Sequence, residues 1–92
     1  MATAPPAVRP FDAKAAAKAA KEFFVAVSEK APVDVMLEEI EWSDDDHWLV
    51  TLGYAGQYLE QVLGTSLGRR YKVFKIDAST GEVVSMKIRP TD

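Results

Sequence analysis

The amino-acid sequence predicts an α+β domain: one N-terminal α-helix packed on a four-stranded antiparallel β-sheet made of two hairpins. The first 30 residues carry apolar side chains at helical spacing, whereas two later regions alternate apolar and polar side chains with a period of two. A turn signal divides each alternating region into two strands. With 92 residues, the chain is long enough for one domain with one modest core.

The chain begins with a segment rich in proline and alanine, so we expect residues 1–11 to form a disordered arm and residues 12–92 to form the single domain. Asp12 is suited to cap a helix that follows it directly. Proline disfavours the helical conformation in the residue before it, so Pro32 ends this helix. Its apolar stripe consists of Ala16, Ala20, Phe23, Phe24 and Val27.

The first hairpin is predicted over residues 35–42 and 47–54, with residues 43–46 as its turn. Side chains that pair across strands share one face of a sheet. The predicted register therefore puts three apolar pairs on one face: Trp42 with Trp48, Ile40 with Val50, and Met36 with Tyr54. It also sets Glu38 opposite Leu52 in this apolar row. Either Glu38 lies at the edge of the core, or the register differs from the predicted one.

The second hairpin is predicted over residues 70–77 and 82–89. Gly81 permits the positive φ that its turn requires, and Asp77 can accept hydrogen bonds from turn amides. The predicted core face of this hairpin carries Phe74, Ile76, Val84, Met86 and Ile88. Residues 55–70 connect the two hairpins and are long for a connection in a compact domain.

The sheet face away from the helix is predicted to be more apolar than a solvated face. The side chains assigned to it are Val35, Leu37, Leu49, Tyr71, Val73 and Val83. Such a face needs a cover. The sequence leaves three candidates open, namely the 55–70 connection, a second copy of the chain, or a different protein.

Charge is distributed unevenly along the chain, although the net charge is only −3. Residues 34–68 contain eight acidic groups and no Lys or Arg, whereas residues 69–92 contain six basic and three acidic groups. Either the acidic and basic strands neutralise each other across the sheet, or an acidic surface meets a basic partner. The acidic middle argues against nucleic-acid binding, which needs a continuous basic face.

No residues form a recognisable catalytic, metal or cofactor site. The chain has no cysteine and one histidine, His47, which follows the turn residues Asp44, Asp45 and Asp46. This spacing lacks the glycine and the later glutamate of a calcium-binding loop, and aspartate is a common turn residue. We therefore predict that the protein is not an enzyme and has no cofactor.

The order of one helix and four strands, closed by Tyr71-x-Val-x-x-Ile-Asp77-x-x-Thr-Gly-Glu-Val83, resembles a PepSY domain. The resemblance covers most of residues 12–89 and implies a small non-catalytic module that binds and regulates or inhibits partner proteins, peptidases among them. The helix-on-sheet arrangement is also similar to cystatins. PepSY domains are usually exported or membrane-tethered. Residues 1–10 show no signal-peptide pattern, so we expect a cytoplasmic protein unless a signal segment is missing.

The predicted function is thus a non-catalytic protein-interaction module that binds a protein partner or itself, and neither nucleic acid nor membrane. Its contact surface is predicted to be the sheet face away from the helix together with the 55–70 connection. The candidate contact residues are Leu37, Leu49, Tyr58, Leu59, Arg69, Arg70, Tyr71 and Val73. The alternatives are a small-ligand pocket between helix and sheet near Phe24, Trp42 and Trp48, or a structural homodimer.

Overall fold

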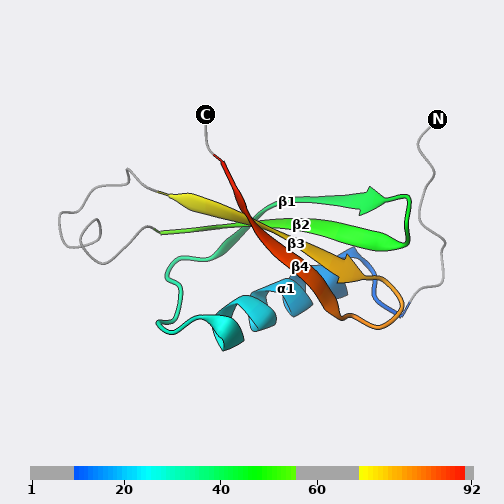
Figure 1. The fold of residues 1–92 in the computed structure, drawn as a ribbon, viewed down its shortest axis with the longest axis horizontal. Coiled ribbons are helices and arrows are strands. Elements are labelled where there is room, and N and C mark those ends of the chain that lie inside the picture. Colours follow the sequence, from blue (N-terminus) through cyan, green and yellow to red (C-terminus); the bar gives the residue numbers. More distant parts are fainter. Residues whose placement is uncertain (1–9, 56–68, 91–92) are drawn as a thin grey trace.

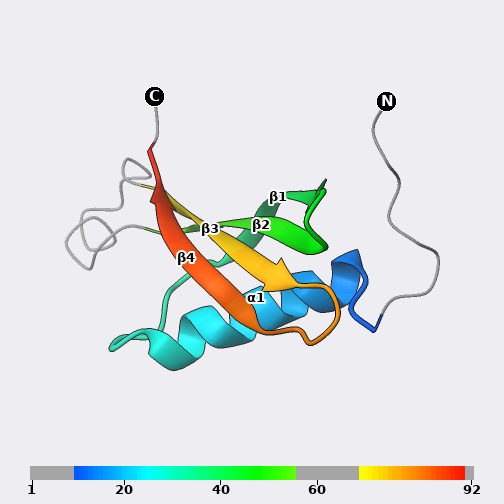
Figure 2. The same ribbon diagram turned by 45° about the vertical axis from the view of Figure 1, so that its right-hand side comes forward.

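The predicted fold class is confirmed by the computed structural model, which describes residues 10–55 and 69–90. One helix lies against one face of a twisted four-stranded antiparallel sheet with strand order β1-β2-β3-β4 (Figures 1 and 2). The elements are α1 (Ala13–Val27), β1 (Met36–Ser43), β2 (His47–Tyr54), β3 (Arg70–Asp77) and β4 (Val83–Arg89). No helix in the described part of the chain is long and apolar enough to cross a membrane.

Helix α1 begins and ends with side-chain caps. The Asp12 carboxylate accepts a hydrogen bond from the Ala15 amide at 2.8 Å, which confirms the predicted N-cap. At the other end, the Ser28 hydroxyl donates to the Phe24 carbonyl at 2.6 Å. The buried stripe consists of Ala16, Ala20 and Phe24, so two small side chains let the helix lie close to the sheet.

Aromatic rings from the helix and the sheet fill the core. The Phe24 ring packs against Tyr54 and Phe74, with centroids 5.0 and 5.6 Å away. The predicted pair of Trp42 and Trp48 is confirmed, and the two rings meet edge to face at 5.0 Å. The largest fully buried side chains are Phe74, Leu52, Ile76 and Val50.

A β-bulge at Glu38 corrects the predicted register of the first hairpin. Beyond Ile40 and Glu39 the pairing shifts, so that Leu37 lies opposite Leu52 and Met36 opposite Gly53. The predicted pairing of Met36 with Tyr54 is therefore wrong. Of the two explanations for a glutamate in an apolar row, the second is correct, because the register changes at that residue.

The bulge also corrects which side chains face the helix. Val35 packs against the core, and Leu37 shares a row with the fully buried Leu52, so the prediction that both point away from the helix is wrong. A second register shift changes which side chains of β4 face the helix. Lys75 pairs with Ser85 but Ile76 pairs with Val83, so Val84 is passed over. There Val83 packs against the core and Val84 is 52% exposed, the reverse of the prediction.

The segment before the helix is joined to both hairpin ends. Phe11 was assigned to the N-terminal arm, but its amide donates to the Ala78 carbonyl at 3.2 Å and its carbonyl accepts from Trp48 Nε1 at 2.9 Å. The Ala78 amide in turn donates to the Asp46 carbonyl at 3.0 Å. Residues 1–9 lie outside the described part of the chain.

The turn between β3 and β4 has the predicted construction. Gly81 has a φ of 78°, and the Asp77 carboxylate accepts hydrogen bonds from the amides of Ser79 and Thr80 at 2.7 and 3.2 Å. The Asp77 carbonyl also accepts from the Gly81 amide at 2.8 Å. Backbone and side chain of one aspartate therefore close this turn.

Candidate functional site

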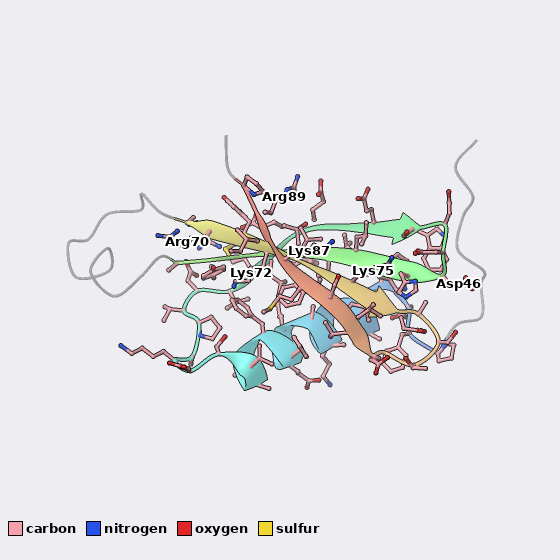
Figure 3. All side chains as sticks on the ribbon, in the orientation of Figure 1. Asp46, Arg70, Lys72, Lys75, Lys87 and Arg89 are labelled. Atoms are coloured by element: carbon pink, nitrogen blue, oxygen red, sulfur yellow. The ribbon has the colours of Figure 1, made fainter. Side chains whose placement is uncertain are left out.

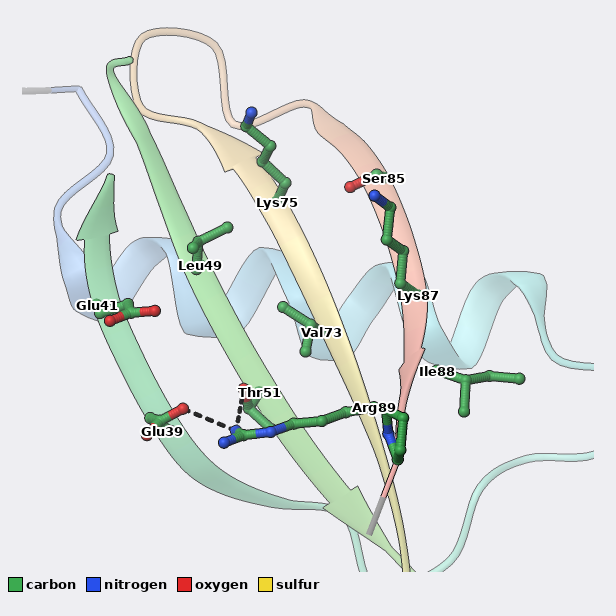
Figure 4. Close-up of a pocket in the computed structure, with 11 residues that line it drawn as sticks. Glu39, Glu41, Leu49, Thr51, Val73, Lys75, Ser85, Lys87, Ile88 and Arg89 are labelled. Carbon is green, nitrogen blue, oxygen red and sulfur yellow. Dashed lines mark hydrogen bonds and ion pairs between the residues drawn. The ribbon is translucent and has the colours of Figure 1, made fainter. Parts of the chain in front are cut away.

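The face of the sheet opposite α1 carries a hollow of about 520 Å³ that all four strands line (Figure 4). In Figure 4 the helix lies behind the sheet. Since α1 is the one helix of the described residues, no helix within 10–55 or 69–90 lies on this face. We call this surface the outer face. Its side chains are Glu39, Glu41, Leu49, Thr51, Val73, Lys75, Ser85, Lys87 and Arg89.

Charge on the outer face is segregated by strand. Glu39 and Glu41 lie on the edge strand β1, whereas Lys75 lies on β3, and Lys87 and Arg89 lie on the other edge strand, β4 (Figure 4). The two central strands contribute the half-buried apolar side chains Leu49 and Val73. The face therefore has an acidic border on β1 and a basic border on β4, and its centre combines Leu49 and Val73 with Thr51 and Lys75.

Arg89 crosses the outer face from one edge strand to the other. Its Nη1 lies 2.7 Å from Glu39 Oε1 and donates to the Thr51 hydroxyl at 3.2 Å (Figure 4). Thr51 is only 3% exposed, so Arg89 supplies a hydrogen-bond partner to a buried hydroxyl. About half of each charged side chain is exposed, so the ion pair itself adds little stability.

Asp45 links the turn between β1 and β2 to the neighbouring strand β3. Its carboxylate accepts hydrogen bonds from Lys75 Nζ at 2.7 Å and from the Ser43 hydroxyl at 2.6 Å. These two bonds hold the pKa of Asp45 well below its ordinary value of 3.8. His47 Nδ1 lies 2.6 Å from the Asp45 carbonyl oxygen. This carboxylate therefore has a structural role in the turn.

Two charges of the outer face have no ion pair with any other residue between 10 and 55 or 69 and 90. They are Glu41 on β1 and Lys87 on β4, and both side chains are exposed. They stand on opposite borders of the same face. They are thus the charges of this face that are available to a second molecule.

The predicted contact residues do not all reach one surface. Leu49 and Val73 lie on the outer face, and Tyr71 shares their side of the sheet because it pairs with Gly53 and Arg89. Leu37 faces the helix side instead, because the bulge shifts its register. Tyr58 and Leu59 lie outside the described residues.

The two predicted arginines differ in their surroundings. Arg69 is held within the chain, since its guanidinium lies 3.0 Å from Asp34 Oδ2 and 3.3 Å from Glu38 Oε2. Arg70 is an exposed residue at the start of β3, at the end of the sheet far from the Asp46 turn (Figure 3). Neither arginine lines the hollow.

Four charged residues of the outer face are not among the predicted contact residues: Glu39, Glu41, Lys87 and Arg89. The signal that locates them is the alternation of β1 and β4, combined with the acidic and basic halves of the chain. Those halves become two sides of one sheet because strand order follows chain order.

The space between helix and sheet, considered for a small ligand, is occupied by the protein's own side chains. Phe24 is 4% exposed and in contact with two sheet aromatics, and Trp48 is 8% exposed with its indole nitrogen hydrogen-bonded to Phe11. Trp42 packs on Trp48. These residues form a packed core.

No protein-family model matches the chain, and the searches of curated proteins and of solved structures find no match either.

Proposed function

We propose that this protein is a non-catalytic interaction module, regulatory or inhibitory, that binds a protein through the outer face. The observation that carries the proposal is the pattern of this face, where half-buried Leu49 and Val73 lie between an acidic and a basic border. Apolar centres with charged rims are typical of protein contact surfaces. Opposite charges at the rim select partners and their orientation more than they add affinity.

A PepSY-like role and a cytoplasmic location belong to the same proposal. The order of elements, with a capped helix followed by two hairpins, supports the first. A sequence without cysteine fits a reducing compartment and supports the second. The packed core around Phe24 and Trp48 favours a protein partner over a small ligand between helix and sheet. Residues 56–68 lie outside the described part of the chain, so the proposal concerns the outer face alone.

The test is a capture experiment with two matched variants, followed by a binding measurement. Tagged wild-type protein, Leu49→Lys and Val25→Lys are incubated with host lysate, and the retained proteins are identified by mass spectrometry. Val25 is 51% exposed on the helix, so its substitution adds the same lysine outside the outer face. Circular dichroism and melting curves first establish that both variants are folded.

We expect a partner that the wild type and Val25→Lys retain and that Leu49→Lys loses. The purified partner should then bind the wild type at least about tenfold more tightly than Leu49→Lys in a titration, because the lysine places a charge in the apolar centre. A partner that binds both variants equally would contradict the placement on the outer face.

A further inference from the structure

We propose that the outer face binds a second copy of this chain, with the two sheets stacked face to face about a two-fold axis parallel to the strands. The inference rests on the proposed function, since it takes the outer face as a protein contact surface and names the occupant. Two observations support it: the order of charges across the sheet and the positions of Leu49 and Val73.

Charge order selects the axis. Rotation about an axis parallel to the strands lays β1 of one copy over β4 of the other, so the acidic border meets the basic border on both sides. Rotation about an in-plane axis across the strands would lay β1 on β1 and β4 on β4. That arrangement would oppose like charges at both borders.

The same axis brings near each other the two charges that have no partner among the described residues. Lys87 lies in the cross-strand row of Glu39, and Glu41 lies one row further along β1. Rotation about this axis leaves each row in line with itself, so Lys87 of each copy stands over Glu39 of the other copy, with Glu41 one row away, about 7 Å along the strand. At each border, Lys87 of one copy therefore lies near the two glutamates of the other copy.

This rotation also brings the central apolar side chains of the two copies next to one another. Leu49 lies on β2 and Val73 on β3, in adjacent rows of the outer face. The axis runs between these two strands and keeps the rows in line, so Leu49 of one copy lies over Lys75 of the other copy and diagonally beside that copy's Leu49 and Val73. Both are half-buried in the single chain, and the second copy removes their remaining surface from water.

The size of the face sets the expected affinity. Four strands with the usual spacing and eight residues of rise make a face of roughly 500 Å². A standard interface buries about 800 Å² per partner, so this dimer belongs to the weak class. We expect a dissociation constant of about 10–100 µM, with tighter binding at low salt because the borders are charged.

The test is sedimentation equilibrium across a wide concentration range, with charge-reversal variants at two exposed positions. Glu41→Lys puts lysine at both positions 41 and 87, and Lys87→Glu puts glutamate at both positions, so each variant brings like charges together at these two positions. Each variant alone should raise the dissociation constant by at least about tenfold, since the rotation repeats the repulsion at two sites. The double variant Glu41→Lys/Lys87→Glu exchanges these two charges and should dimerise more tightly than either single variant.

The most discriminating measurement uses an equimolar mixture of the two single variants. Positions 41 and 87 carry lysine in one variant and glutamate in the other, so the mixture brings opposite charges together at both borders and should form a heterodimer that neither component forms alone. Melting curves for each variant exclude unfolding as the cause of a lost dimer. A wild type that stays monomeric at millimolar concentration, or a mixture that stays monomeric, overturns the proposal.

Different results would contradict the interaction module and the self-association of the outer face. A monomeric wild type whose captured partner is lost in Leu49→Lys overturns self-association and leaves the interaction module standing. A dimer that all three charge variants retain overturns the stacking about this axis. A monomeric wild type with no partner sensitive to Leu49→Lys contradicts both proposals.

Discussion

Gly81 is confined by its backbone and by a neighbouring ring at the same time. Its φ of 78° is a conformation that side chains disfavour, and a Cβ at this position would overlap the Phe11 ring. We predict that Gly81→Ala lowers the free energy of unfolding by about 1–3 kcal/mol, measured by urea denaturation. In a Phe11→Ala background the loss should shrink toward the backbone cost alone. An equal loss in both backgrounds would show that the ring does not contribute.

Asp45 makes the stability of the protein depend on acid pH. Its folded-state pKa is lowered, chiefly by the hydrogen bond from Lys75 and then by that from Ser43. A lowered pKa stabilises the fold above the unfolded value of 3.8, and this contribution is lost as the pH falls toward the folded-state pKa.

We therefore predict that Asp45→Asn is less stable than the wild type at pH 7 and that the difference narrows as the pH falls below about 4. Urea denaturation at several pH values measures it. Lys75→Met removes the largest cause of the pKa shift. In that background, the stability difference caused by Asp45→Asn should therefore change less with pH. A difference between wild type and Asp45→Asn that stays constant down to pH 2 would contradict this assignment.

At the scale of the strands, two identical neighbouring side chains of β4 have opposite surroundings. Val83 packs against the core, whereas Val84 is 52% exposed. We predict that Val83→Asp lowers the free energy of unfolding by about 1–3 kcal/mol, because it brings a carboxylate to the core. Val84→Asp should change it by less than about 0.5 kcal/mol. Thermal and urea denaturation measure both losses. If Val84→Asp were the more destabilising variant, the bulge would have to lie elsewhere.

The same strands show what a period of two can predict. The limits of β2 and β3 are those expected from the sequence, because apolar alternation and turn residues mark them. The bulges are harder to predict, since alternation assumes an unbroken register. Glu38 in an apolar row was a visible sign of the first one. The second bulge has no such sign. Val83 and Val84 are identical residues, so the sequence does not indicate which of them faces the core.

At the scale of the whole molecule, the candidate site follows from charge order more than from apolar content. The acidic and basic halves of the chain are visible in the sequence, and the sheet turns them into two borders. Two ion pairs, Asp45–Lys75 and Glu39–Arg89, neutralise charge across strands, whereas Glu41 and Lys87 have no ion pair within residues 10–55 and 69–90. The two bulges move Val35, Leu37 and Val83 to the helix side and place Met36, opposite Gly53, in an outer row, so they change which apolar side chains belong to each face.

Three segments far apart in the chain meet at the end of the sheet where the helix begins. Trp48 Nε1 donates to the Phe11 carbonyl, Phe11 donates to Ala78, and Ala78 donates to Asp46. The start of the helix and both hairpin turns are therefore connected through one chain of hydrogen bonds. Trp48 is only 8% exposed, so this hydrogen bond is largely shielded from water. Removing the indole N–H therefore leaves the Phe11 carbonyl without its partner, which costs stability.

We predict that Trp48→Phe lowers the free energy of unfolding by about 1–3 kcal/mol, the sum of a lost hydrogen bond and a smaller buried ring. Amide hydrogen exchange separates this junction from a purely local defect. If the three segments are held together through Phe11, the amides of Phe11 and Ala78 should both lose protection in the variant, although neither donates to Trp48. Unchanged protection at Ala78 would mean that the two hairpin turns hold each other without the segment before the helix.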